Sequence, residues 1–239
     1  MRKRSRRIAG PFVLAVMAMA ATPAIAYEEG TVSGSGTIEG KVTFNGAVPT
    51  RKIIPNKDVE VCGGIREEPL IEVGPDKAVQ NAVVYLADVA KGKAWPAAGK
   101  PPELDNLKCR FVPDVQVIRA GPLVVINSDP VLHNTHGYYG KRTAFNMALP
   151  NQGQQIPTEL TRAGPVKVDC DAHGWMEGWI YVVDNPYYAI TGADGKFSIT
   201  DVPPGTYSLV AIQSLTGPVQ QSVTVAGGKP TTITIELKK

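Results

Sequence analysis

Histidine, cysteine and methionine are scarce in this 239-residue chain, which contains three, three and five of them respectively. No apolar run beyond residue 26 is long enough to span a bilayer. No segment beyond that point repeats its apolar residues over three or four helical turns. These absences exclude a membrane span and a helical fold for residues 27–239.

The first 26 residues have the three parts of a secretory signal peptide. Five cations lie within residues 1–7, an apolar run covers residues 12–21, and small residues end the segment at Ala26. We therefore expect cleavage near Ala26 and a soluble protein that is periplasmic or secreted. The pair Arg6-Arg7 leaves a twin-arginine route open, but the residues after it lack bulky apolar side chains, so ordinary export is favoured.

Charge gives no reason to expect a nucleic-acid partner. The formal net charge of +3 becomes −2 once the five cations of the signal peptide are removed. No basic patch with interleaved aromatic residues is left in the mature sequence. Nucleic-acid binding is therefore excluded, and the oligomeric state is left open.

The composition is that of an all-β protein. Glycine and proline are plentiful, and apolar residues alternate in short runs bounded by turn residues. We expect a flexible lead over 27–36, then an N-terminal β segment over 37–106 with an irregular part at 47–80 and an exposed loop at 91–102. Residues 185–239 form four or five further strands, which we interpret as a second, smaller β-sandwich domain rather than a continuation of one sandwich.

All three histidines lie in two short runs, Asp129-Pro-Val-Leu-His133-Asn134-Thr-His136 and Cys170-Asp-Ala-His173-Gly-Trp-Met176. Thiolate and thioether donors favour Cu(I), and imidazole accommodates Cu(II). His133, Cys170, His173 and Met176 therefore match the ligand set of a blue-copper centre. A short loop between two predicted strands would hold the last three nearly fixed, as electron transfer requires.

Neighbouring residues suggest supporting roles around this site. The amide of Asn134 is placed to bridge to the Cys170 loop. Gly174 and Trp175 would give a partly exposed His173 an apolar rim, against which a redox partner protein could dock briefly. His136 is expected to be hydrogen-bonded structure rather than a ligand.

The same residues fit two other chemistries less well. Zinc could use the cysteine and two histidines with a water, but a methionine in fourth place argues against it. Cys170 and His173 are cramped as a nucleophile and base, and no orienting acid stands out. Because four ligands saturate the metal, we do not expect an enzyme. Copper trafficking or sensing, and a cell-surface interaction module with an ancillary copper site, stay open as alternatives.

Cys62 and Cys109 are the two cysteines outside the metal motif. Exported proteins oxidise free thiols, so the default is that these two form a disulfide. Cys170 would then be the single unpaired thiol, as a metal ligand must be.

The two histidine runs resemble the cupredoxin family, most closely its plastocyanin and amicyanin branch, over about residues 107–184. The resemblance implies a Greek-key sandwich with one type 1 copper, three equatorial ligands and one axial ligand. Carried over, the equatorial ligands are His133, Cys170 and His173, and the axial ligand is Met176.

The C-terminal part is similar to a different family. Residues 185–239, with Ala193-Asp-Gly-Lys-Phe-Ser-Ile and Asp201-Val-Pro-Pro-Gly-Thr-Tyr, look like the second half of a carboxypeptidase-regulatory-like sandwich. Segments 36–42 and 79–86 look like its first half. The copper domain would then be inserted within that sandwich, which requires contacts between residues 37–44 and 196–212.

Overall fold

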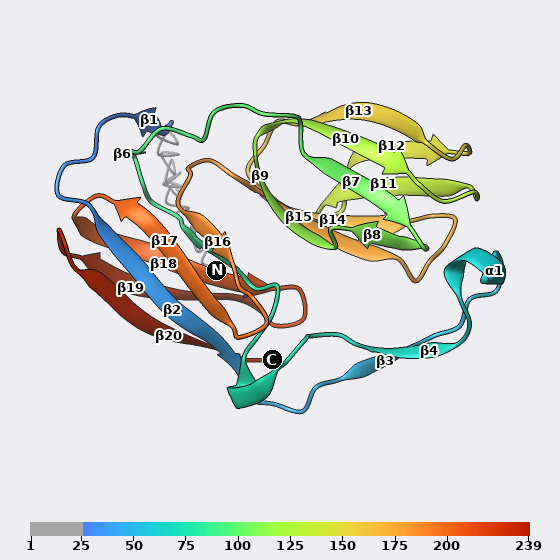
Figure 1. Cartoon of the computed structure of the whole chain (residues 1–239), viewed down its shortest axis with the longest axis horizontal. Coiled ribbons are helices and arrows are strands. Elements are labelled where there is room, and N and C mark those ends of the chain that lie inside the picture. Colours follow the sequence, from blue (N-terminus) through green and yellow to red (C-terminus); the bar gives the residue numbers. More distant parts are fainter. Residues whose placement is uncertain (1–25) are drawn as a thin grey trace, which may run out of the picture.

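The computed structural model describes residues 26–239, so the predicted signal peptide up to residue 25 lies outside the described residues. Within them the chain forms twenty strands and two short helices, α1 (Val59–Cys62) and the 3₁₀ helix η1 (Pro75–Lys77). Most of these strands form two sandwiches (Figure 1), and the prediction of an all-β protein is confirmed. Neither helix in the described part combines the length and apolar character needed to cross a membrane.

The central sandwich consists of two sheets. One has the strand order β13 (Gln154–Leu160), β10 (Gly121–Asn127), β7 (Glu103–Leu107), β8 (Arg110–Val112). The other has the order β12 (Arg142–Leu149), β11 (His133–Tyr139), β14 (Gly164–Cys170), β15 (Glu177–Val183), β9 (Val115–Arg119). The chain crosses repeatedly between the sheets, as expected for a Greek-key sandwich. The first strand of this sandwich, β7, begins at Glu103, four residues before the region predicted over 107–184.

The alternation of side chains along β11 and β14 determines which residues lie at one end of this core. Val166, Val168 and Cys170 share the buried side of β14, because successive side chains of a strand point to opposite faces. His133 and Thr135 are buried in the same way on β11. Thr135 pairs with Cys170 across the two strands. The pattern of the sheet therefore places the His133 and Cys170 side chains at the same end of the core.

The smaller sandwich uses strands from both ends of the chain. Its sheets have the orders β16 (Tyr188–Ile190), β5 (Val83–Leu86), β18 (Gly205–Gln213), β19 (Gly217–Val225) and β17 (Lys196–Val202), β2 (Gly36–Phe44), β20 (Pro230–Leu237). The pairing of β2 with β17 is the contact that an inserted arrangement requires. We propose on this basis that the central sandwich is inserted within the smaller one.

The segment predicted to be irregular contains a hairpin, β3 (Thr50–Ile53) paired with β4 (Arg66–Pro69), with α1 at its tip. We call residues 50–69 the strap. In Figure 1 the strap leaves the smaller sandwich and carries α1 to the end of the central sandwich. Two further short strands, β1 (Glu28–Glu29) and β6 (Lys91–Gly92), pair in parallel within the expected flexible lead and exposed loop.

The predicted disulfide is confirmed. Cys62, the last residue of α1, is bonded to Cys109 in the turn between β7 and β8, 47 positions later. Cys170 is free and buried. The crosslink ties the strap to the central sandwich, and a native disulfide of this kind typically stabilises a fold by about 2–4 kcal/mol.

A carboxylate also ties the strap to the central sandwich. Glu68 of β4 accepts hydrogen bonds from Arg66 at 2.8 Å and from Arg110 of β8 at 2.5 Å. Burial raises the pKa of Glu68, but the hydrogen bond from Arg66 and the charges of Arg110, Arg66 and Arg51 outweigh it and lower the pKa below its ordinary value. The carboxylate form is therefore favoured in the folded protein.

This shift predicts a pH-dependent effect of Glu68→Gln. A lowered carboxyl pKa stabilises the fold above the ordinary pKa and loses that contribution as the pH falls through the folded value. We expect the variant to lose about 1–2 kcal/mol of unfolding free energy at pH 7, and much less below about pH 4. Urea unfolding at pH 7 and pH 3 measures the difference, with the exposed neighbour Glu67→Gln as the control. An equal loss at both pH values would contradict the argument.

Candidate metal centre

Three of the four predicted ligands meet at the end of the central core. The Nδ1 atoms of His133 and His173 are 3.1 Å apart, and each lies 3.7 Å from the Sγ atom of Cys170. Both imidazoles are fully buried, and Cys170 is 1% exposed. Sulfur and two ring nitrogens therefore face one small volume that is closed to solvent.

The loop between β14 and β15 positions the remaining part of the motif. The His173 N–H donates to the Cys170 carbonyl at 3.2 Å, and the Met176 N–H donates to the His173 carbonyl at 2.9 Å. These two tight turns fold the loop back so that Met176 is 3% exposed and lies in the same hydrophobic core as Cys170. All four predicted ligands are thus buried at one end of the central sandwich.

The outer nitrogen of each imidazole is held by a carboxylate. His133 Nε2 lies 2.9 Å from Asp129 Oδ2, and His173 Nε2 lies 2.9 Å from Asp58 Oδ2. A carboxylate on one ring nitrogen keeps the proton there and leaves the other nitrogen as a free lone pair. In both rings that free nitrogen is Nδ1, the atom that faces Cys170.

Sequence reasoning did not assign either carboxylate a role. Asp129 is four positions before His133 in the quoted motif, so its proximity to that residue was a usable signal. Asp58 is 115 positions from His173, in the strap, and nothing in the local sequence connects the two.

The separations between the three donor atoms match those of ligands that share one metal ion. Two ligands of one ion, with metal–nitrogen bonds of about 2.0 Å and metal–sulfur bonds of about 2.3 Å, lie roughly 3.3–3.8 Å apart. The two sulfur–nitrogen separations of 3.7 Å fall in this range, and the nitrogen pair at 3.1 Å is slightly closer. The group fits one ion that accepts sulfur and imidazole donors.

Burial governs the protonation of this cluster. Burial raises the pKa of the Cys170 thiol above its ordinary value, although the N–H groups of Asn134, His173 and Ala172 act in the opposite direction. Burial likewise lowers the pKa of His133, and this outweighs the opposing effect of Asp129. The neutral form of His133 is therefore favoured in the folded protein. A bound cation would favour the thiolate form of Cys170.

Asn134 bridges to the Cys170 loop through its backbone, not through its side-chain amide as expected. Its N–H donates to Cys170 Sγ at 3.5 Å, and its carbonyl accepts from the Asp171 N–H at 3.1 Å. The side-chain Oδ1 is buried without a hydrogen-bond partner in the described part of the chain. The backbone makes the bridge because β11 and β14 are neighbours in the sheet.

His136 does not join the cluster. Three positions after His133, it lies on the other face of β11, where Nδ1 is 3.1 Å from Asp171 Oδ2 and Nε2 is 2.9 Å from Thr143 Oγ1. Its ring stacks on Tyr138 with the ring centroids 3.9 Å apart. These contacts fit the structural role expected for it.

His173 differs from the expectation in its exposure. A partly exposed imidazole with an apolar rim was predicted, and the structure buries the side chain completely. Trp175 does pack near it, with ring centroids 5.1 Å apart. The reason for the difference is the strap, which brings Asp58 and the disulfide against the same ring.

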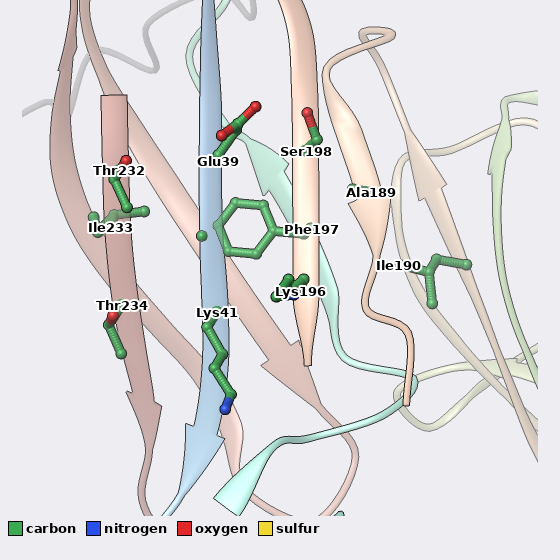
Figure 2. A pocket seen from close by; sticks show the side chains of 11 residues that line it. Glu39, Lys41, Ala189, Ile190, Lys196, Phe197, Ser198, Thr232, Ile233 and Thr234 are labelled. Carbon is green, nitrogen blue, oxygen red and sulfur yellow. The ribbon is translucent and has the colours of Figure 1, made fainter. Parts of the chain in front are cut away.

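A cavity of about 720 Å³ lies in the smaller sandwich, along β2, β17 and β20. Figure 2 shows Phe197 beside β2, with Glu39, Lys41 and Lys196 around it. The ring occupies the space above Gly40, where a Cβ atom would be 2.6 Å from it. No histidine or cysteine lines this cavity, so it does not compete with the central site as a metal centre.

From the contacts of Asp129 we predict that Asp129→Ala lowers both the free energy of unfolding and the affinity for a metal ion. Asp129 is 3% exposed and accepts from the N–H groups of Lys108 and Cys109 at 2.7 and 2.8 Å. Leaving these donors and His133 without a partner should remove about 2–4 kcal/mol of unfolding free energy and weaken metal binding by about 10–100-fold. Urea unfolding and competition with a chelator measure the two effects. The exposed Asp114→Ala should change neither, and equal behaviour of the two variants would contradict the assignment.

Comparisons with known proteins give the following matches. Residues 180–238 match the carboxypeptidase regulatory-like domain family. Among solved structures the chain is similar to an amicyanin mutant in its reduced Cu(I) form at pH 4, with 21% identity over 36% of this chain and 86% of that one, at a TM-score of 0.33. It is also similar to the purple cupredoxin of Nitrosopumilus maritimus, with 22% identity over 34% and 99% of the two chains and a TM-score of 0.31. A copper-containing nitrite reductase from Thermus scotoductus SA-01 is 20% identical over 42% and 25%, with a TM-score of 0.32. No curated protein matches the chain.

Proposed function

We propose that this protein is an exported one-electron carrier with a single type 1 copper bound by His133, Cys170, His173 and Met176. The observation that carries the proposal is the buried group of two Nδ1 atoms and one Sγ atom at 3.1–3.7 Å from one another. The buried thioether of Met176 favours copper over zinc, which prefers harder donors. Export follows from the predicted signal peptide.

The residues of the chain perform three tasks in this mechanism. Asp129 and Asp58 hold the two imidazoles in one tautomer and orientation, so that their lone pairs are ready before an ion arrives. The N–H group of Asn134 points at the sulfur and stabilises its negative charge. The surrounding core excludes water. Bound copper would supply the one-electron couple between Cu(I) and Cu(II).

A fixed ligand set suits electron transfer better than catalysis at the metal. Cys170 is the last residue of β14 and Met176 directly precedes β15, its paired neighbour, so little rearrangement would accompany a change of oxidation state. Four protein ligands leave no coordination position for a substrate. We therefore propose an electron carrier with a redox partner protein, rather than an enzyme.

Addition of Cu(II) to the metal-free protein, with the Cys170 thiol free and the disulfide intact, should produce an intense blue or green colour from thiolate-to-copper charge transfer. Cys170→Ser and His133→Ala should abolish this band, because each removes a proposed ligand. His136→Ala is the matched control and should keep it, since His136 lies outside the donor group. Visible absorption and electron paramagnetic resonance measure the result. A colourless Cu(II) form of the unaltered protein would refute the type 1 assignment.

Copper trafficking is separated from electron transfer by a second measurement. A carrier should cycle between Cu(I) and Cu(II) repeatedly with ascorbate and ferricyanide while retaining its metal, because its ligands are buried and fixed. Ready loss of Cu(I) to a chelator such as bathocuproine disulfonate, without reversible cycling, would favour trafficking. The colour and the retention of copper over several cycles are the quantities to follow.

A further inference from the structure

The strap reaches the metal centre through one side chain. Asp58 Oδ2 lies 2.9 Å from His173 Nε2, and this carboxylate comes from residues 50–69 rather than from the central sandwich. His173 is fully buried, whereas the Asp58 side chain is 33% exposed. The strap thus lies between the His173 imidazole and solvent.

The backbone at Asp58 leaves its side chain free for this contact. Its φ angle of 51° is in the left-handed region, which aspartate tolerates better than most residues. The carbonyl of Asp58 accepts from the N–H groups of Val61 and Cys62, at 3.0 and 2.8 Å. Its side chain makes no capping hydrogen bond to α1, the usual role of aspartate at that position. The carboxylate is directed at His173 instead.

Two attachments fix the strap just beyond Asp58. The first is the Cys62–Cys109 disulfide, whose sulfurs lie within 4.8 Å of a ring nitrogen of His173. The second is the ion pair of Glu68 with Arg110 on β8, at 2.5 Å. Cys109 also donates its N–H to Asp129, the partner of His133. The disulfide therefore joins the two carboxylate–imidazole pairs into one structure.

We propose that the strap is a fixed cover of the metal centre and that Asp58 is the positioning residue through which it orients His173. The positioning role rests on the proposed copper function, whereas the cover can be tested without metal. The cover closes the imidazole edge that a docking protein or a small anion would otherwise reach. A carrier built this way exchanges electrons through the strap or another face, not through an exposed His173.

The chain provides a matched control for Asp58. Asp76 has nearly the same backbone conformation, with φ at 52°, but its side chain is 90% exposed and lies 4.0 Å from Lys41 Nζ. Glycine adopts this conformation without strain. Asp58→Gly and Asp76→Gly therefore each remove a carboxylate and change the conformational freedom of the backbone to a similar extent. Asp58→Asn keeps a side-chain oxygen that can accept from Nε2–H and serves as the conservative rescue.

The first measurement uses the metal-free protein. Cys170 is the single free thiol of the chain, so its alkylation by iodoacetamide reports how often the site opens. We expect Asp58→Gly to alkylate about tenfold faster or more, the change expected from losing one charge-assisted hydrogen bond. Asp58→Asn should alkylate at an intermediate rate and Asp76→Gly like the unaltered protein. Cys62→Ser/Cys109→Ser, which releases the strap, should also be faster.

The second measurement uses the Cu(II)-loaded protein. Asp58→Gly should bind copper about 10–100-fold more weakly. Added azide should change its visible and paramagnetic resonance spectra, because a His173 imidazole that Asp58 no longer holds could give up its coordination position to the anion. The unaltered protein and Asp76→Gly should not respond to azide. A merely structural role of Asp58 would not produce this spectral response to a small anion, nor its reversal in Asp58→Asn.

The outcomes separate the cover from the copper proposal. Alkylation and azide responses of Asp58→Gly that match those of Asp76→Gly would overturn the inference while leaving a blue copper site intact. A colourless Cu(II) protein would refute the copper site and with it the positioning role, but the alkylation rates would still support or overturn the cover. Circular dichroism of each variant shows that a rate change reflects local opening rather than unfolding.

Discussion

Two hydrogen bonds, Asp129 with His133 and Asp58 with His173, determine which nitrogen of each imidazole is free to bind a metal ion. Each ring has two nitrogens, and a proton on the inner one would turn a metal ligand into a hydrogen-bond donor. Asp129 and Asp58 hold the proton on Nε2 and leave the two Nδ1 lone pairs facing each other at 3.1 Å. Lone pairs at that distance repel, and a shared cation removes the repulsion. The chemistry of the site follows from the carboxylates as much as from the ligands they hold.

Because the two carboxylates come from different parts of the chain, their relative position needs its own support. Asp129 lies in the loop before β11 and also accepts the Cys109 N–H at 2.8 Å. Asp58 directly precedes α1, whose last residue is bonded to Cys109. The Cys62–Cys109 disulfide therefore restricts the distance between the carboxylates of Asp58 and Asp129. Its contribution to stability comes mainly from restricting the unfolded chain, and its contribution to the site comes from rigidity.

The alternation of apolar and polar residues in the sequence predicted the strands and the loop that carries three of the proposed ligands. The spacing of Cys170, His173 and Met176 between two alternating strands indicated a loop at the end of a buried core, and the structure has this loop. The exposure of His173 was predicted wrongly, because its cover comes from a strap with strands of four residues and a helix of four, too short for a periodic signal. Asp58 was missed for the same reason. Its contact with His173 depends on a disulfide and on tertiary packing, neither of which leaves a local pattern.

The strap also connects the two hydrophobic cores. Phe44 and Ile71, on either side of it, are buried in the core of the smaller sandwich, whereas Cys62 within it is buried in the core of the central one. The chain therefore leaves one core, places a cysteine in the other and returns. Two more connections join the sandwiches, between β5 and β7 and between β15 and β16. Three connections, the strap and these two, restrict rotation of one sandwich against the other far more than a single linker would. The segment that crosses between the two cores also carries Asp58 to the imidazole of His173, so the position of that carboxylate depends on the packing of both sandwiches.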